Sequence, residues 1–224
     1  MIRALCALLV LCGSSWSTLA DDAKRVTAIF LVARAELPDP RFKDSVVLVM
    51  NQMRPVPVGV IINKPTRITV SQLFPELPHL ARLDDKVYFG GPVDVQALSF
   101  IFRAAKPPDD VTEVLDGVYF STNSELLREL LGRDKPVEGL RLFVGYASWA
   151  PGQLEGEVSN GDWNLAPANA SAIFDGKPER RWLELYRPGV GQRASRRDAE
   201  APGSAARAPG HLHDAVRFSQ QKPG

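Results

Sequence analysis

The sequence has little cysteine and no excess of either charge, and each shortage excludes a class of protein. Only two of its 224 residues are cysteine, and both, Cys6 and Cys12, lie close to the N-terminus. The rest of the chain therefore offers no disulfide, no thiol nucleophile and no cysteine-ligated zinc. Lysine and arginine number 27 against 26 acidic residues, which argues against nucleic acid as a partner of the molecule as a whole.

Histidine is also scarce, so metal and acid–base chemistry have few candidate residues. Of the three histidines, His79 lies among prolines and leucines, and we expect a loop side chain there rather than a catalytic base. The other two, His211 and His213, lie near the C-terminus. A transition-metal site would need carboxylates alone, and none are spaced for one, so we expect no metal and no cofactor. The standard esterase, nucleotide-binding and dinucleotide-binding motifs do not occur in the sequence.

Residues 1–20 have the pattern of a secretory signal peptide. Arg3 precedes the apolar run Ala4–Cys12, and Thr18–Ala20 fits a small-x-small cleavage site. The run is shorter than the ~20 apolar residues that a membrane span requires. We therefore expect a periplasmic or secreted protein without a transmembrane span, with a cytoplasmic location as the alternative.

Residues 189–224 form a second separable end. They are rich in glycine, proline, alanine, serine and arginine and contain few large apolar residues. Such a segment buries too little surface to offset its ordering entropy, so we expect a disordered basic tail. Residues 21–188 remain as one mildly acidic domain, long enough for a hydrophobic core.

Short apolar runs rich in β-branched residues indicate buried strands in this domain. The predicted strands cover residues 26–33, 45–50, 56–62, 87–89, 98–103, 118–121 and 140–147. Most strands follow one another through connections too short for βαβ crossovers. The sequence therefore predicts an α+β fold, a single compact domain with a mixed, largely antiparallel sheet and a few short helices.

Several helical segments accompany these strands. Thr122 and Glu125 have the spacing of a capping box, a leucine stripe follows them, and Gly132 is suited to end the helix. Shorter helical turns are predicted at residues 70–73 and after Pro178, which fits a first-turn position.

Four segments of the domain resemble the YqgE/AlgH family of bacterial proteins in order and spacing. They are FLVAR, PDPRF and SVV between Phe30 and Val47, GVIINKPT at Gly59–Thr66, YFGGPV at Tyr88–Val93, and GYASW with PGQLEGE between Gly145 and Glu157, followed by Trp163. The resemblance implies one compact α+β domain and no particular activity. One member is named for a proposed role in regulating alginate synthesis, but no DNA-binding element is evident in this sequence.

The sequence departs from the family pattern in three places. Met50-Asn51 stands where relatives usually carry a Glu-His pair, and this puts any role of that histidine in doubt. The N-terminal leader and the C-terminal tail are additions that most relatives lack. The final helix is expected to stop at Pro188.

The segment Trp149–Glu157 is the strongest candidate for a binding site. A rigid turn through Gly152 is expected to precede a short helix over residues 153–159, whose first amides are able to hold an anion. Gln153 and Glu157 would share one face of that helix. In a purely structural interpretation, Gly152 makes a tight turn, Trp149 packs against Trp163 and the polar side chains cap the turn.

Two other segments carry candidate binding residues. Arg34 and Arg41 flank the Pro38–Pro40 loop, where they either bind a carboxylate or phosphate or pair locally with Glu36 and Asp39.

Asn63 and Thr66 follow the third predicted strand. Asn63 is suited to satisfy the turn by itself, and Lys64 is then expected to point to solvent. The glycine pair Gly90-Gly91 allows a close backbone approach, most simply by another strand.

These observations lead to three functional hypotheses. The first is an exported, non-catalytic binding or interaction domain whose partner is a small molecule or a protein. The second is a hydrolase-type enzyme that uses polar groups near Trp149–Glu157, Asn63 and Arg34. The third is a regulatory protein that acts through protein partners. The sequence specifies neither the ligand nor the oligomeric state.

Overall fold

A computed structural model describes residues 28–50, 56–106 and 108–187, and every structural statement below concerns these residues. The predicted signal peptide, the predicted tail and Asn51 lie outside them. Within the described part of the chain, no helix is long and apolar enough to cross a membrane.

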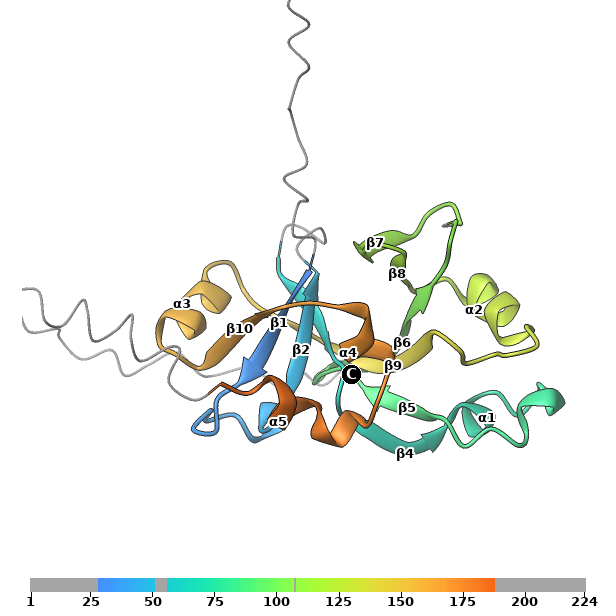
Figure 1. The fold of residues 1–224 in the computed structure, drawn as a ribbon, viewed down its shortest axis with the longest axis horizontal. Helices are drawn as coiled ribbons and strands as arrows, with labels where there is room; N and C mark the ends of the chain where they lie inside the picture. The colour runs from blue at the N-terminus through green and yellow to red at the C-terminus, as the bar shows by residue number, and fades with distance from the viewer. Residues whose placement is uncertain (1–27, 51–55, 107, 188–224) are drawn as a thin grey trace, which may run out of the picture. The chain divides into compact units, whose positions relative to one another are not determined.

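Ten strands form one curled sheet in the described residues (Figure 1). They are β1 (Ala28–Ala33), β2 (Val46–Met50), β3 (Val58–Ile61), β4 (Pro65–Thr69), β5 (Lys86–Phe89), β6 (Val93–Arg103), β7 (Thr112–Leu115), β8 (Val118–Ser121), β9 (Leu140–Ser148) and β10 (Trp163–Pro167). The strand order is β10-β1-β2-β3-β9-β6-β8-β7, with β5 beside β9 and β4 beside β5. The pairing of β5 with β9 is parallel, and the other pairs of described strands are antiparallel.

Five short helices accompany the sheet in the described residues. They are α1 (Val70–Leu73), α2 (Ser124–Leu131), α3 (Gln153–Ser159), α4 (Ala170–Phe174) and α5 (Arg181–Leu185). Single 3-10 turns occupy Pro40–Phe42, Pro78–Leu80 and Pro178–Arg180. The predicted α+β class with a mixed, largely antiparallel sheet is confirmed.

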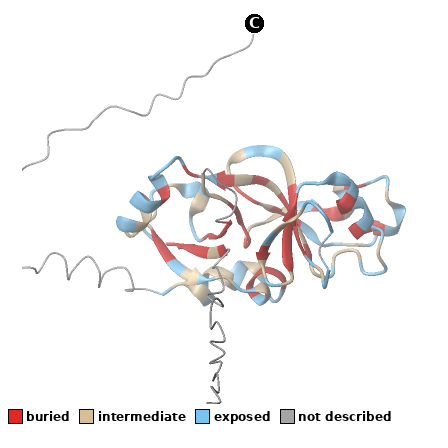
Figure 2. Cartoon of the chain, turned by 90° about the horizontal axis from the view of Figure 1, so that it is seen from above, coloured by how far each residue is buried: buried red, intermediate tan, exposed pale blue. Residues whose placement is uncertain are grey.

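Consecutive residues of the central strands are buried on opposite faces of the sheet, which explains why these strands appear as unbroken apolar runs. In β1, Leu31 belongs to a cluster that includes Leu154 of α3, whereas Phe30 belongs to a cluster that includes Phe174 of α4. Figure 2 shows buried residues concentrated along the strands. Because both faces are covered, these strands lack the apolar–polar alternation of a half-exposed sheet.

The strand predictions were right for the buried strands and incomplete for the exposed ones. The predicted runs correspond to β1, β2, β3, β5, β8, β9 and the second half of β6. The strands β4, β7 and β10 were not predicted, because their residues are partly exposed and form no apolar run: Ile68 in β4 and Leu165 in β10 are 45% and 54% exposed.

The predicted start of α2 was wrong by one residue. Asn123, not Thr122, is the N-cap: its side-chain oxygen accepts hydrogen bonds from the amides of Glu125 at 2.9 Å and Leu126 at 3.1 Å. Asparagine is the stronger capping residue of the two, because its carbonyl oxygen reaches these amides readily. Gly132 ends the helix as predicted, and its amide donates to the Arg128 carbonyl.

The Gly90-Gly91 pair is where three strands meet. The Gly90 amide donates to the Val144 carbonyl of β9 at 2.9 Å, and the Gly90 carbonyl accepts from the Ile61 amide of β3 at 2.8 Å. A β-carbon at Gly90 would collide with the carbonyl oxygen of Gly145. The expectation that another strand approaches this pair is confirmed.

Candidate functional site

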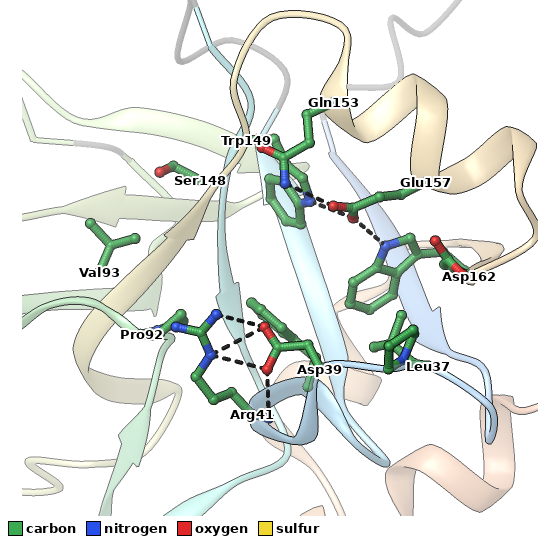
Figure 3. A pocket seen from close by; sticks show the side chains of 13 residues that line it. Leu37, Asp39, Arg41, Pro92, Val93, Ser148, Trp149, Gln153, Glu157 and Asp162 are labelled. Atoms are coloured by element: carbon green, nitrogen blue, oxygen red, sulfur yellow. Dashed lines mark hydrogen bonds and ion pairs between the residues drawn. The ribbon is translucent and has the colours of Figure 1, made fainter. Parts of the chain in front are cut away.

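A hollow of about 370 Å³ opens beside α3, where the end of β9, the start of β10 and the loop after β1 come together (Figure 3). Much of its wall is apolar and includes the indoles of Trp149 and Trp163 and the ring of Phe42. The polar side chains that line it are Asp39, Arg41, Ser148, Gln153, Glu157 and Asp162.

The carboxylate of Glu157 is the centre of one wall. Its Oε2 accepts hydrogen bonds from the indole nitrogens of Trp149 and Trp163, each at 2.9 Å, and its Oε1 accepts one from Nε2 of Gln153 at 2.8 Å. Both tryptophans are 4% exposed, and their rings meet edge to face at 6.4 Å. Glu157 therefore links the end of β9, helix α3 and the start of β10.

The turn before α3 has the predicted form. Gly152 has φ 78°, in the left-handed region that favours glycine, and no atom of the described residues lies within 4 Å of where its β-carbon would be. The Gln153 side-chain oxygen accepts from the Ala150 amide at 3.0 Å, so this side chain caps the turn. These contacts and the packing of Trp149 against Trp163 are those that the structural interpretation predicted, and α3 spans the residues that the sequence predicted.

Asp39 and Arg41 form the opposite wall as a local ion pair. The Arg41 guanidinium donates to both Asp39 oxygens, with the shortest contact at 2.6 Å, and the Arg41 amide donates to the same carboxylate at 2.9 Å. These hydrogen bonds from Arg41 hold the pKa of Asp39 below its usual value.

The expectation that Lys64 points to solvent was wrong. Its Nζ donates to the Arg41 carbonyl at 2.8 Å, and burial lowers the pKa of this ammonium group. This hydrogen bond connects the Asp39–Arg41 loop to Lys64, the residue directly before β4.

Asp162 lines the hollow and was not predicted from the sequence. Its amide donates to the Glu157 carbonyl and its carbonyl accepts from the Arg34 amide, both at 3.0 Å. Among the described residues, no hydrogen bond or ion pair engages its carboxylate. Burial, and secondarily the nearby charge of Glu157, raise the pKa of Asp162. A lone Asp between glycine and tryptophan carries no motif that would have revealed it.

Four of the predicted site residues line the hollow: Arg41, Trp149, Gln153 and Glu157. Gly152 shapes the adjoining turn without lining the cavity. Arg34, Asn63 and Thr66 lie elsewhere, so the polar groups that the enzyme hypothesis combined are not gathered around one cavity.

Local contacts engage these three outlying side chains, although the buried Nε of Arg34 has no hydrogen-bond partner among the described residues. Asn63 accepts from the Val46 amide at 2.7 Å and donates to the Asp44 carbonyl at 2.9 Å. Arg34 pairs with Glu36 at 3.7 Å, and the Thr66 hydroxyl accepts from the Ile68 amide at 3.1 Å.

The protein is a single α+β domain with a small cavity. Polar and apolar side chains line this cavity, and Trp149 and Trp163 form part of its wall. The chain matches the model of the AlgH-like family (DUF179) over residues 30–192, and it belongs to that family. The resemblance that the four sequence segments indicated is thereby confirmed.

The chain is also similar to UPF0301 proteins of several bacteria. A UPF0301 protein of Chlorobaculum parvum is 33% identical over 159 residues, covering 70% of this chain and 83% of the relative. One from Mycobacterium leprae is 31% identical over 177 residues, covering 75% and 85%.

Two solved structures share the fold. The solution structure of the AlgH protein from Pseudomonas aeruginosa superimposes with a TM-score of 0.61 at 24% identity, covering 82% of this chain and 98% of that protein. A crystal structure from Corynebacterium diphtheriae gives a TM-score of 0.57 at 27% identity, covering 73% and 88%.

Proposed function

We propose that this chain is an exported, non-catalytic binding domain whose ligand occupies the hollow beside α3. One observation carries the proposal: the polar groups on two sides of the hollow are already held by the protein. Both oxygens of Asp39 accept from Arg41, and both oxygens of Glu157 accept from Gln153 and the two indoles. Fixed polar groups on an apolar wall are typical of a preformed ligand pocket.

The same contacts disfavour the hydrolase alternative. Among the described residues that line the hollow, Ser148 is the one that carries a hydroxyl group. For Ser148 to act as a nucleophile, a carboxylate or histidine would have to be free to accept its proton. Asp39 and Glu157 are engaged by several donors each, and among the described residues no hydrogen bond joins the Ser148 hydroxyl to Asp162, the lining carboxylate that lacks a donor. The His79 ring is engaged elsewhere, with its Nε2 at 2.9 Å from the Leu131 carbonyl.

Binding is tested by nuclear magnetic resonance on the full chain, with the indole N–H signals of Trp149 and Trp163 as reporters of the hollow. Three probes with one apolar body and different charges are added separately: butylammonium, butan-1-ol and butyrate. We expect at least one to shift both indole signals in a saturable way. Ser148→Phe, which fills the hollow, should abolish the shift, whereas Ser171→Phe on α4 should leave it unchanged.

Two outcomes contradict this proposal. If none of the three probes shifts the indole signals, the hollow is not a binding site for groups of this size. If the chain hydrolyses p-nitrophenyl butyrate and Ser148→Ala abolishes that turnover, the domain is an enzyme and not a binding module.

The export part of the proposal rests on Arg3, the apolar run and the cleavage-site pattern at Thr18–Ala20. N-terminal sequencing of the protein isolated from its own cells should find Asp21 or a close neighbour as the first residue. A chain without residues 2–20 should stay in the cytoplasmic fraction. A wild-type chain that retains Met1 and fractionates with the cytoplasm would contradict export.

A further inference from the structure

We propose that the ligand of the hollow is a primary ammonium group carried on a short aliphatic body, and that the Asp162 carboxylate binds the ammonium. The inference rests on the proposed function, because it assigns a ligand class to the same hollow. Three observations lead to it: the charges that line the cavity, the unengaged carboxylate of Asp162, and the apolar wall beside it.

The first observation is the charge of the lining. Asp39, Glu157 and Asp162 contribute three carboxylates, and among the described lining residues Arg41 contributes the one cation. That guanidinium is already paired with Asp39 at 2.6 Å. The ion pair is close to neutral from a distance, so the side of the hollow around Glu157 and Asp162 remains negative and favours a cation over an anion.

The second observation separates Asp162 from the other two carboxylates. Glu157 receives three hydrogen bonds and Asp39 is held by Arg41, whereas no described group donates to the Asp162 carboxylate. The neighbouring Arg34 touches Asp162 through its backbone amide, while its guanidinium pairs with Glu36 at 3.7 Å. Among the described residues, no cation offsets the partial burial of Asp162, which agrees with the raised pKa of that carboxyl group. An arriving ammonium would supply the missing donor.

The third observation concerns the size and the apolar part of the ligand. The cavity of about 370 Å³ lies at the small end of ligand pockets, so it suits one group of side-chain size. Phe42 and Trp163 stand edge to face at 5.7 Å in its wall, and such rings accept both aliphatic chains and cations. An ammonium at the end of a butyl chain combines the two features.

The test compares the same three butyl probes at constant ionic strength, again through the indole signals of Trp149 and Trp163. We expect butylammonium to bind about tenfold more tightly than butan-1-ol, as one charge-assisted hydrogen bond warrants, and butyrate to bind more weakly than either. Asp162→Asn should reduce the affinity for butylammonium to that of butan-1-ol. Glu155→Gln makes the same charge change on the exposed side of α3 and should leave the preference intact.

The outcomes distinguish this inference from the proposed function. If none of the probes shifts the indole signals, the hollow does not bind and both proposals fall. If butan-1-ol or butyrate binds as tightly as butylammonium, the hollow remains a binding site but its ligand is not an ammonium. If Asp162→Asn keeps the preference for butylammonium, Asp162 is not the group that recognises it. Should Asp162→Asn fail to fold, Asp162→Ser replaces it in the same comparison.

The same chemistry belongs to a free alkylamine and to a lysine side chain on a partner protein. A further probe, N-acetyl-lysine N-methylamide, carries the butylammonium group on a peptide backbone. Tighter binding than butylammonium assigns the hollow to a protein-borne lysine, and weaker binding assigns it to a free amine. Both results support the ammonium class.

Discussion

The two polar walls of the hollow are held together in different ways. On the α3 wall, the Glu157 carboxylate joins Trp149, which directly follows β9, to Trp163 of β10, and both tryptophans are 4% exposed. On the loop wall, Asp39 pairs with Arg41, two residues further along, and the Arg41 side chain is 61% exposed. A carboxylate that satisfies two buried donors stabilises the fold, whereas an ion pair exposed to water contributes little. The comparison predicts unequal effects of similar substitutions.

The largest effect is expected on the α3 wall. Glu157→Ala leaves two buried indole N–H groups without an acceptor and should lower the free energy of unfolding by about 3 kcal/mol. Glu157→Gln retains a carbonyl oxygen and should cost less. Urea denaturation measures both, with Glu155→Ala as the control on the exposed side of the same helix. An equal, small loss for Glu157→Ala and Glu155→Ala would remove the distinction between the two walls.

An intermediate effect is expected at the turn that positions α3. Gly152→Ala should lower the free energy of unfolding by about 1 kcal/mol, because an L-residue resists the left-handed backbone at φ 78°. Gly156→Ala is the matched control, because it lies within α3 and its added β-carbon also meets no atom of the described chain within 4 Å. Alanine at that position should raise stability by about 0.5–1 kcal/mol. Thermal unfolding of the pair in the same buffer checks the opposite signs, and shifts in the same direction would contradict the backbone argument.

The smallest effects are expected from the two aspartates, with opposite signs. The folded-state pKa of Asp39 is lowered, so its contribution is present above the pKa of the unfolded chain and is lost as pH falls through the folded value. Asp39→Asn should therefore cost about 0.5 kcal/mol at neutral pH and nothing in strong acid. The pKa of Asp162 is raised, so its charge opposes folding above that pKa, and Asp162→Asn should slightly raise stability at neutral pH. Urea titrations at neutral and acidic pH measure both variants. A loss of stability in Asp162→Asn would mean that the carboxylate has a donor in the folded protein.

Much of the fold was predictable because the buried strands are recognisable in the sequence as apolar runs. The strands β1, β2, β3 and β9 are covered on both faces, so each appears as a run of apolar residues. Among the described strands, the edge strands β7 and β10 each pair with one other strand. Part of their side chains is exposed, so their sequences contain no apolar run. Their positions depend on which strand lies alongside, and that is a tertiary property.

The candidate site was predictable only in part, for a related reason. Proline and glycine around α3 mark its ends, so the positions of Gln153 and Glu157 on one helix face followed from local rules. The common acceptor for Trp149 and Trp163 depends on the pairing of β10 with β1, which no local pattern encodes. For the same reason the sequence did not predict Asp162 as a site residue and placed Asn63, which lies outside the hollow, among the candidate binding residues. Asn63 is 6% exposed and satisfies backbone groups of the loop and strand before it.

The meeting of three strands at Gly90 has a consequence for the order of folding events. Gly90 is hydrogen-bonded to Ile61 on one side and to Val144 on the other, and both partners lie far from it in the chain. Two long chain segments must close before these bonds form, and each closure costs entropy that no local contact offsets. Topologies dominated by such distant pairings fold slowly. We therefore expect the bonds at Gly90 to form after the β1–β2 and β2–β3 hairpins, so that weakening them accelerates unfolding more than it slows folding.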